Sequence, residues 1–231
     1  MKILSRTSLL AIAVFAITGI ALLAYTSSRA SQTILPPDAG GSPAPDVSSA
    51  RPLVSRTESI EVDRPLPVVL KVAAKPLESA VRGAGSLPGV VRTSMLTPGE
   101  FGAPGSRRLV HLSDTSTLVE EVLAREQSEQ TFLFRYVVWN FQGPSAGKVD
   151  FGVGEFYYEA LPRDRTRIRW TYSFKLNSRT FPGVLGPVGR FFFRVGFFER
   201  SFADMMRGVL RGYKDGAEAT DLPATGSSAA R

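Results

Sequence analysis

Two adjacent carboxylates are the residues of this sequence best suited to acid–base chemistry. Glu120 and Glu121 lie within TLVEEVLARE, a segment that reads as a β-strand. Neighbouring strand residues point to opposite faces of a sheet, so one of the two carboxylates points inward or toward an edge. There it could act as a lone general acid or base, and the alternative is a solvated or ion-paired side chain.

The chain offers little else for catalysis or metal binding. His111 is the single histidine and there is no cysteine, so His or Cys metal clusters, disulfides and thiol catalysis are excluded. Ser113 and Asp114 follow His111 around a turn, and such close neighbours do not form a catalytic triad. We expect no metal, no cofactor and no catalytic residue, with His111 in a structural or surface role.

Tyrosines offer a different chemistry, hydrogen bonding to a ligand. Tyr136, Tyr158 and Tyr172 lie in three segments that alternate like strands. Their hydroxyl groups could hold the polar end of a ligand in an otherwise apolar pocket. The sequence GVG at 152–154 continues into one of these strands, so it is not a phosphate loop, and its glycines predict a bend or bulge.

The elements that must position these residues follow from the same alternation. A strand at 55–62 precedes the helix-compatible residues 64–81, which Pro76 divides into two short helices. A strand at 89–98 and five further strand-like segments follow, separated by short turns. This order predicts an α+β domain with a curved antiparallel sheet of about seven strands.

A long amphipathic helix is predicted after the last strand. Apolar residues recur at helical spacing from Phe191 to Tyr213, so the helix would cover the dry face of the sheet. On ideal helix geometry Phe193 and Phe197 fall on the polar side beside an arginine, which is typical of a membrane-surface contact. The alternative is that the helix begins later, or that both rings pack on the loop around Gly186.

The two ends of the chain differ from its middle. Residues 1–30 start with Lys2 and Arg6 and then run apolar over 9–25, typical of a secretory signal or an N-terminal membrane anchor. Either one sends the rest of the chain to the extracytoplasmic side, membrane-anchored or, after cleavage, secreted or periplasmic. Residues 31–54 are rich in Pro, Ala, Gly and Ser and predict a disordered linker, and 219–231 a disordered tail.

The net charge of +7 gives weak evidence for a polyanionic partner. Several basic residues lie in the N-terminal segment, and export makes nucleic acid a poor partner, so we expect none. One basic set lies in and around the last predicted strand, opposed locally only by Asp164. It is either a solvated sheet face or a contact for anionic lipid headgroups, and its members are Arg163, Arg165, Arg167, Arg169, Lys175 and Arg179.

The predicted order of elements resembles the helix-grip fold of the SRPBCC superfamily, which includes START lipid carriers, pollen-allergen-like proteins and polyketide cyclases. VRTSMLTPG, LVHLSDTSTLVEEVLAREQSEQTFLFRYVV and RTRIRWTYSFK carry the local likeness, and the resemblance covers 55–218. It implies a sheet that grips the long helix without closing fully, which leaves a cavity. The residues expected to line it are Phe134, Tyr136, Phe156, Tyr158, Trp170, Tyr172, Phe174, Phe202 and Met206.

Three functions follow from this reading. The first is a non-catalytic, membrane-tethered or secreted protein that holds a lipid or other hydrophobic small molecule, with the membrane contacted through residues 9–25. The second is an enzyme like a polyketide cyclase or dehydratase that uses Glu120, Glu121 or a pocket tyrosine. The third is an interaction module whose cavity is filled by its own side chains.

Overall fold

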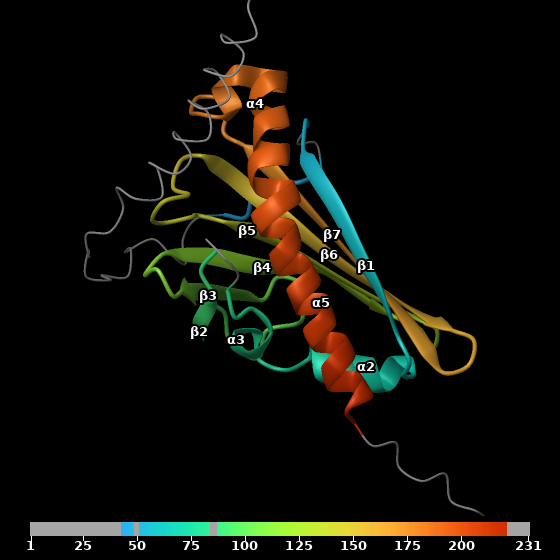
Figure 1. The fold of residues 1–231 in the computed structure, drawn as a ribbon. Coiled ribbons are helices and arrows are strands. Elements are labelled where there is room, and N and C mark those ends of the chain that lie inside the picture. The colour runs from blue at the N-terminus through green and yellow to red at the C-terminus, as the bar shows by residue number, and fades with distance from the viewer. Residues whose placement is uncertain (1–42, 49–50, 84–86, 221–231) are drawn as a thin grey trace, which may run out of the picture.

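Alternating apolar and polar residues build most of the described chain into one antiparallel sheet. The computed structural model describes residues 43–48, 51–83 and 87–220. The strand order is β1-β7-β6-β5-β4-β3-β2, so the first and last strands lie side by side (Figure 1). This confirms the predicted seven-stranded sheet. The strands are β1 (Val54–Val62), β2 (Val90–Met95), β3 (Arg107–Leu112), β4 (Thr117–Gln127), β5 (Thr131–Trp139), β6 (Val149–Leu161) and β7 (Arg165–Leu176).

Two short helices connect β1 to β2, as the sequence predicts. They are α2 (Leu66–Ala73) and α3 (Leu77–Ala80), and each is preceded by a proline, Pro65 or Pro76. Proline fits this position because the first helical residues have no backbone partner for their N–H groups. Val69 and Val72 of α2 are buried against the core, which ties the connection to the domain.

The C-terminal helix is longer than predicted and changes its winding. After the 3-10 turn η1 (Gly183–Leu185) it runs through α4 (Gly186–Phe193), the π-helical segment η2 (Arg194–Phe202) and α5 (Ala203–Glu218). It descends diagonally across one face of the sheet (Figure 1). We call this the concave face. No helix within the described residues is long and apolar enough to cross a bilayer, and the apolar run at 9–25 lies outside them.

The concave face and the helix enclose the main core. Ile168 of β7 and Met206 of α5 are completely buried in it. Burying a side chain of this size stabilises the fold by about 1.5–3 kcal/mol relative to leaving it in water. The alternation along β7 therefore has the predicted consequence, since its apolar residues face the helix.

A second, smaller core lies on the opposite, convex face. Trp139, Phe151 and Val153 belong to it, and Ala44, Val47 and Leu53 pack against them. The sequence predicts a disordered linker up to residue 54, but these three residues lie on the sheet. Apolar side chains dispersed among Pro, Gly and Ser produce no periodic signal, which explains why composition alone misses this contact.

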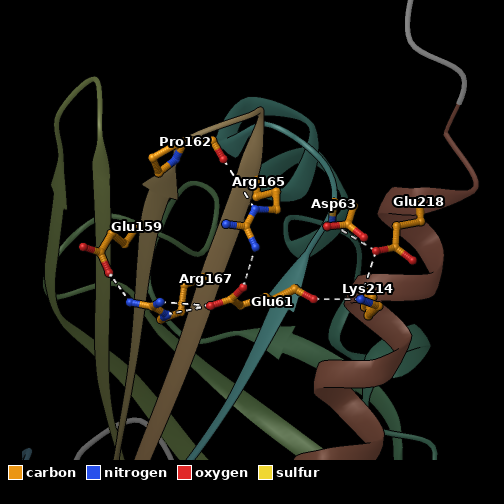
Figure 2. Close-up of polar contacts among 8 residues, drawn as sticks. All are labelled: Glu61, Asp63, Glu159, Pro162, Arg165, Arg167, Lys214 and Glu218. Carbon is orange, nitrogen blue, oxygen red and sulfur yellow. Dashed lines mark hydrogen bonds and ion pairs between the residues drawn. The ribbon is translucent and has the colours of Figure 1, made fainter.

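Charged residues fasten the end of α5 to the sheet (Figure 2). Glu61 of β1 accepts from Arg165 at 2.9 Å and from Arg167 at 2.9 Å, and Lys214 donates to its backbone carbonyl at 2.8 Å. Glu218 accepts from the backbone N–H of Asp63 at 3.0 Å. Part of the basic set of β7 is thus paired with acids from neighbouring strands, which the local sequence, with Asp164 alone, does not indicate.

Candidate ligand-binding site

All nine residues predicted to line a cavity lie in the concave core. Seven of them come from three adjacent strands, β5, β6 and β7, and two from the helical segment above them. The rings are packed on one another: Phe156 stacks on Trp170 with centroids 4.5 Å apart, and Tyr172 lies 4.7 Å from Phe202. The structure therefore gathers the predicted residues into one aromatic wall.

Two glycines make room for two of the tyrosines. A Cβ atom on Gly152 would lie 2.8 Å from the Tyr172 ring, and one on Gly154 would overlap the Tyr136 ring. The register of β6 with β5 is continuous through both glycines, so they do not mark a bulge. The irregularity of β6 lies just before the glycines, as a register shift against β7 between Val149 and Phe151, and the glycines themselves let the two tyrosine rings lie close to the β6 backbone.

One buried ion pair lies at the edge of this wall. Glu120 of β4 stands opposite Val138 of β5, a core residue, so its side chain is on the concave side. Its carboxylate accepts from Arg108 Nε at 2.6 Å, and the Arg108 guanidinium stacks over the ring of Phe101 at 3.8 Å. Glu120 is thus the inward-pointing carboxylate of the two adjacent glutamates, but it is paired with Arg108 and is not the lone acid or base that the sequence suggests.

The sequence carried a signal for this pair that strand alternation does not use. Arg108 and Glu120 lie at matching positions on either side of the short turn between β3 and β4, and so do Arg107 and Glu121. Residues directly opposite each other in an antiparallel hairpin are neighbours in space. Opposite charges mirrored about a turn therefore predict both ion pairs, and Glu121 indeed pairs with Arg107 on the convex side.

The tyrosines near this pair keep their protons. Burial raises the pKa of Tyr172 and of Tyr136 far above the ordinary value, and the negative charge of Glu120 raises both further. Burial also raises the pKa of Tyr213 on α5 to about 12, although the positive charge of Arg108 opposes the shift. At neutral pH these hydroxyls are hydrogen-bond donors, not bases.

Trp170 adds a donor to the same wall. Its indole nitrogen lowers the pKa of the Tyr136 hydroxyl, against the larger effect of burial. Within the described chain this buried nitrogen makes no hydrogen bond of normal geometry. The Tyr136 hydroxyl is thus the neighbour of this indole nitrogen.

A groove of about 580 Å³ lies between the α2–α3 segment and α5, and none of the nine predicted cavity residues lines it. Its volume is in the range of small-molecule sites. Val81 of the α3 side and Val209 and Tyr213 of α5 line it, and they also belong to or pack on the concave core. The ring centroid of Tyr213 lies 6.1 Å from that of Phe156. The charges of Arg108 and Glu120 shift the pKa of its hydroxyl in opposite directions. Tyr213 therefore lines the groove, contacts the aromatic wall and lies near the ion pair.

The remaining predicted residues lie elsewhere. His111 is buried at the end of β3, with its ring 3.5 Å from the Ser94 hydroxyl, and burial and Arg92 lower its pKa. Among the described residues no group of three His, Cys, Asp or Glu side chains could hold a metal ion. Phe193 and Phe197 are half-buried and contact Phe174, with ring centroids at 5.6 Å and 6.2 Å.

The π-helical segment explains the placement of these two rings. Its backbone bonds join residues five apart, so side chains four and five positions apart come onto one face. Phe193, Phe197, Phe198 and Phe202 consequently point to the core together. Phe191, which ideal α-helical spacing places inward, is instead 59% exposed.

No family model and no curated protein matches the sequence. Among solved structures, Ara h 8.0201 matches with a TM-score of 0.51 and 11% identity over 73% of this chain and 100% of that chain. A hypothetical protein from Helicobacter pylori gives 0.51 and 12% over 82% and 98%. The di-domain ARO/CYC StfQ from the steffimycin biosynthetic pathway gives 0.51 and 14% over 72% and 51%, so the match spans about half of that protein.

This chain itself has the order one strand, two short helices, six strands and a long helix. At such low sequence identity, these structural matches are evidence for the fold alone. The chain therefore has the helix-grip fold.

Proposed function

We propose that this protein binds a hydrophobic small molecule or lipid against the aromatic wall and does not transform it. The observation that carries this proposal is Tyr213, which lines the groove and also faces Phe156 and the Arg108–Glu120 pair. The groove combines apolar residues such as Val81 and Val209 with charged residues such as Arg82 and Asp215. This distribution is what a site for an amphipathic molecule needs.

The polar groups favour a ligand whose buried end carries oxygen atoms. The hydroxyls of Tyr172 and Tyr213 are protonated, and the indole N–H of Trp170 has no partner of normal geometry in the described chain. Arg108 adds a guanidinium with donors beyond the one used by Glu120. Such a set binds hydroxyl, carbonyl or carboxylate oxygen and rejects a purely hydrocarbon end.

An enzyme of the cyclase or dehydratase kind is the second candidate, because Glu120 faces the wall and StfQ is called an ARO/CYC. The geometry makes it the weaker one. The tyrosines hold their protons at neutral pH, and Glu120 is tied to Arg108 at 2.6 Å. A turnover that depends on pH and disappears in Glu120→Gln, with ligand binding retained, would establish the enzyme.

We further propose that the domain works outside the cytoplasm, tethered through residues 9–25 or released after cleavage. The support is the sequence alone, where two basic residues precede an apolar run. Protease protection of the full chain in membrane vesicles, compared with the molecular mass of the mature protein, distinguishes the two forms.

The binding proposal is tested by blocking the groove without disturbing the core. A Cβ atom at Gly208 or Gly212 on α5 would meet nothing within 4 Å, and both glycines line the groove. Gly208→Phe fills the space with a ring, and Gly208→Ala is the matched control because it changes the helix in the same place without filling it. Both replacements favour the helix over glycine.

The measurement is native mass spectrometry of the full chain, expressed with export, followed by organic extraction. We expect a discrete bound molecule in the parent protein and in Gly208→Ala, and its loss in Gly208→Phe. An unliganded mass that takes up nothing from a lipid extract would overturn the proposal and favour the interaction module with a filled cavity.

A further inference from the structure

A group of large apolar side chains is exposed at one end of the molecule, around η1 and α4. We call it the α4 tip, and it consists of Phe181, Val184, Leu185, Val188, Phe191 and Phe192, which are between 39% and 59% exposed. Single exposed apolar residues are ordinary, but a contiguous group marks a contact surface. The tip forms the upper end of the long helix, away from α2 and α3 (Figure 1).

The tip rests on a rigid base. Phe193 and Phe197 pack with their rings 5.0 Å apart and both contact Phe174 of β7. The π-helical winding of η2 directs these rings inward and leaves Phe191 and Phe192 outside. The exposed rings are therefore held outward by the fold and do not result from a loose segment.

The charged residues within the tip segment are all positive. From Asn177 to Phe198 the sequence contains Arg179, Arg190 and Arg194 and no acidic residue. Arg194 contacts the backbone of Ser55 at 3.4 Å, so this cation stays beside the tip. Exposed Phe, Val and Leu flanked by arginines match the boundary between acyl chains and anionic headgroups, where apolar rings enter and cations stay outside.

The chain that precedes the domain leaves from the same end of the sheet. Val54 at the start of β1 is paired with Phe174, the residue on which the base of the tip packs. Lys175 donates to the carbonyl of Arg51 at 3.1 Å, which brings the segment before β1 to this end.

We propose that the α4 tip docks on an anionic membrane surface, with Phe191, Phe192 and Val188 in the headgroup region and Arg190 and Arg194 at the phosphates. This contact differs from the predicted one at Phe193 and Phe197, which lie at the base of the tip. It also goes beyond ligand binding and does not depend on it, since none of these residues lines the groove.

The absence of cysteine from the chain allows a direct test. Val188→Cys places a single thiol on the tip and Met95→Cys places one on the edge strand β2, at positions 57% and 41% exposed. Each full-length variant is labelled with an environment-sensitive fluorophore and reconstituted in phosphatidylcholine vesicles with or without phosphatidylglycerol, some carrying a lipid-bound quencher. Because both variants share the same tether, any difference between them reports the tip.

We expect the Val188 label to shift to shorter wavelength and to be quenched in vesicles containing phosphatidylglycerol, while the Met95 label is unchanged. Adding Phe191→Ser and Phe192→Ser to the Val188 variant should abolish the shift, and Arg190→Gln should weaken it about fivefold in apparent affinity for the anionic lipid. Equal signals from both labels would overturn the proposal. So would a shift of the Val188 label that appears without vesicles and grows with protein concentration, which would assign the tip to a second copy of the chain.

Discussion

The β3–β4 hairpin carries the same chemistry twice, once on each face of the sheet. Arg107 pairs with Glu121 on the convex side, and their side chains are 26% and 13% exposed. Arg108 pairs with Glu120 on the concave side, and their side chains are 13% and 5% exposed. Neighbouring residues of identical type thus lie in a partly wet and in a nearly dry environment.

The difference between the two pairs shows what separates a structural contact from a candidate site. The convex pair lies over Trp139 next to solvent and needs no further partner. The concave pair lies among tyrosines whose hydroxyls remain protonated, beside a groove large enough for a small molecule. The residue types alone do not distinguish the pairs; the face of the sheet does.

Breaking each pair should give the largest contrast in stability. Arg108→Met leaves the Glu120 carboxylate buried without its cation and should lower the free energy of unfolding by about 3–5 kcal/mol. Arg107→Met leaves Glu121 nearer to water and should cost about 1 kcal/mol or less. Urea denaturation of the two variants measures both values, and equal losses would mean that the two environments do not differ as described.

The glycines under the tyrosines sharpen the same contrast on the concave side. Gly154→Ala forces a methyl group into the Tyr136 ring and should destabilise the fold by about 1–3 kcal/mol. Gly147→Ala, on the loop before β6, is a comparison in which the methyl group meets no atom within 4 Å but the positive φ of 68° is strained, whereas Gly154 has no positive φ and its loss would come from overpacking alone. A Gly154→Ala variant as stable as the parent would show that the rings are free to move aside.

The raised pKa values predict how the concave side responds to alkali. A tyrosine whose pKa is raised by folding contributes stability below the unfolded value near 10, and this contribution is lost as the pH rises toward the folded value. For Tyr213, with a pKa of about 12, the free energy of unfolding should fall by about 1.4 kcal/mol per pH unit between pH 10 and about pH 12. Ultraviolet titration of tyrosinate checks this, and ionisation of every tyrosine near pH 10 in the folded protein would contradict it.

The acidic limit should show a smaller effect at the end of α5. The hydrogen bond from Arg167 lowers the pKa of Glu61, and the backbone N–H of Asp63 lowers that of Glu218. Groups with lowered pKa contribute stability above their unfolded value near 4.5 and lose it as the pH falls further. The protection of α5 amides against hydrogen exchange, taken relative to the intrinsic exchange rate at each pH, should therefore fall below that pH in the parent protein. In Glu218→Gln this acid-dependent loss of protection should be weaker than in the parent protein. An identical loss would show that the Glu218 contact with the Asp63 backbone does not stabilise α5.

The sequence was sufficient for most of the fold. Period-two alternation along β7 and its neighbours gives the strands and their inward faces, and Pro65 and Pro76 give the starts of two helices. Ideal helical spacing fails only where η2 changes the winding, because a π-helical segment leaves no mark in hydrophobic periodicity. The inward and outward phenylalanines at 191–197 are therefore exchanged.

The site was less accessible to sequence reasoning. The aromatic wall follows from strand parity, but Arg108 and Phe101 come from pairing across a turn and from a loop folding back, which parity does not report. Gly152 and Gly154 illustrate the same limit. Their role depends on which rings lie above them, and this is a property of the adjacent strands β5 and β7.

The comparison of the two pairs also provides the most direct test of ligand binding. The double variant Arg108→Met with Glu120→Leu removes both concave charges together, which keeps the fold because no buried charge is left unpaired. Arg107→Met with Glu121→Leu does the same on the convex side. The measurement is the affinity of each variant for the molecule extracted from the parent protein, or for a fluorescent fatty acid if none is extracted. We predict at least about a tenfold loss for the concave variant, corresponding to one lost charge-assisted hydrogen bond, and none for the convex variant. Equal affinity in both would contradict the assignment of the concave pair to the ligand site.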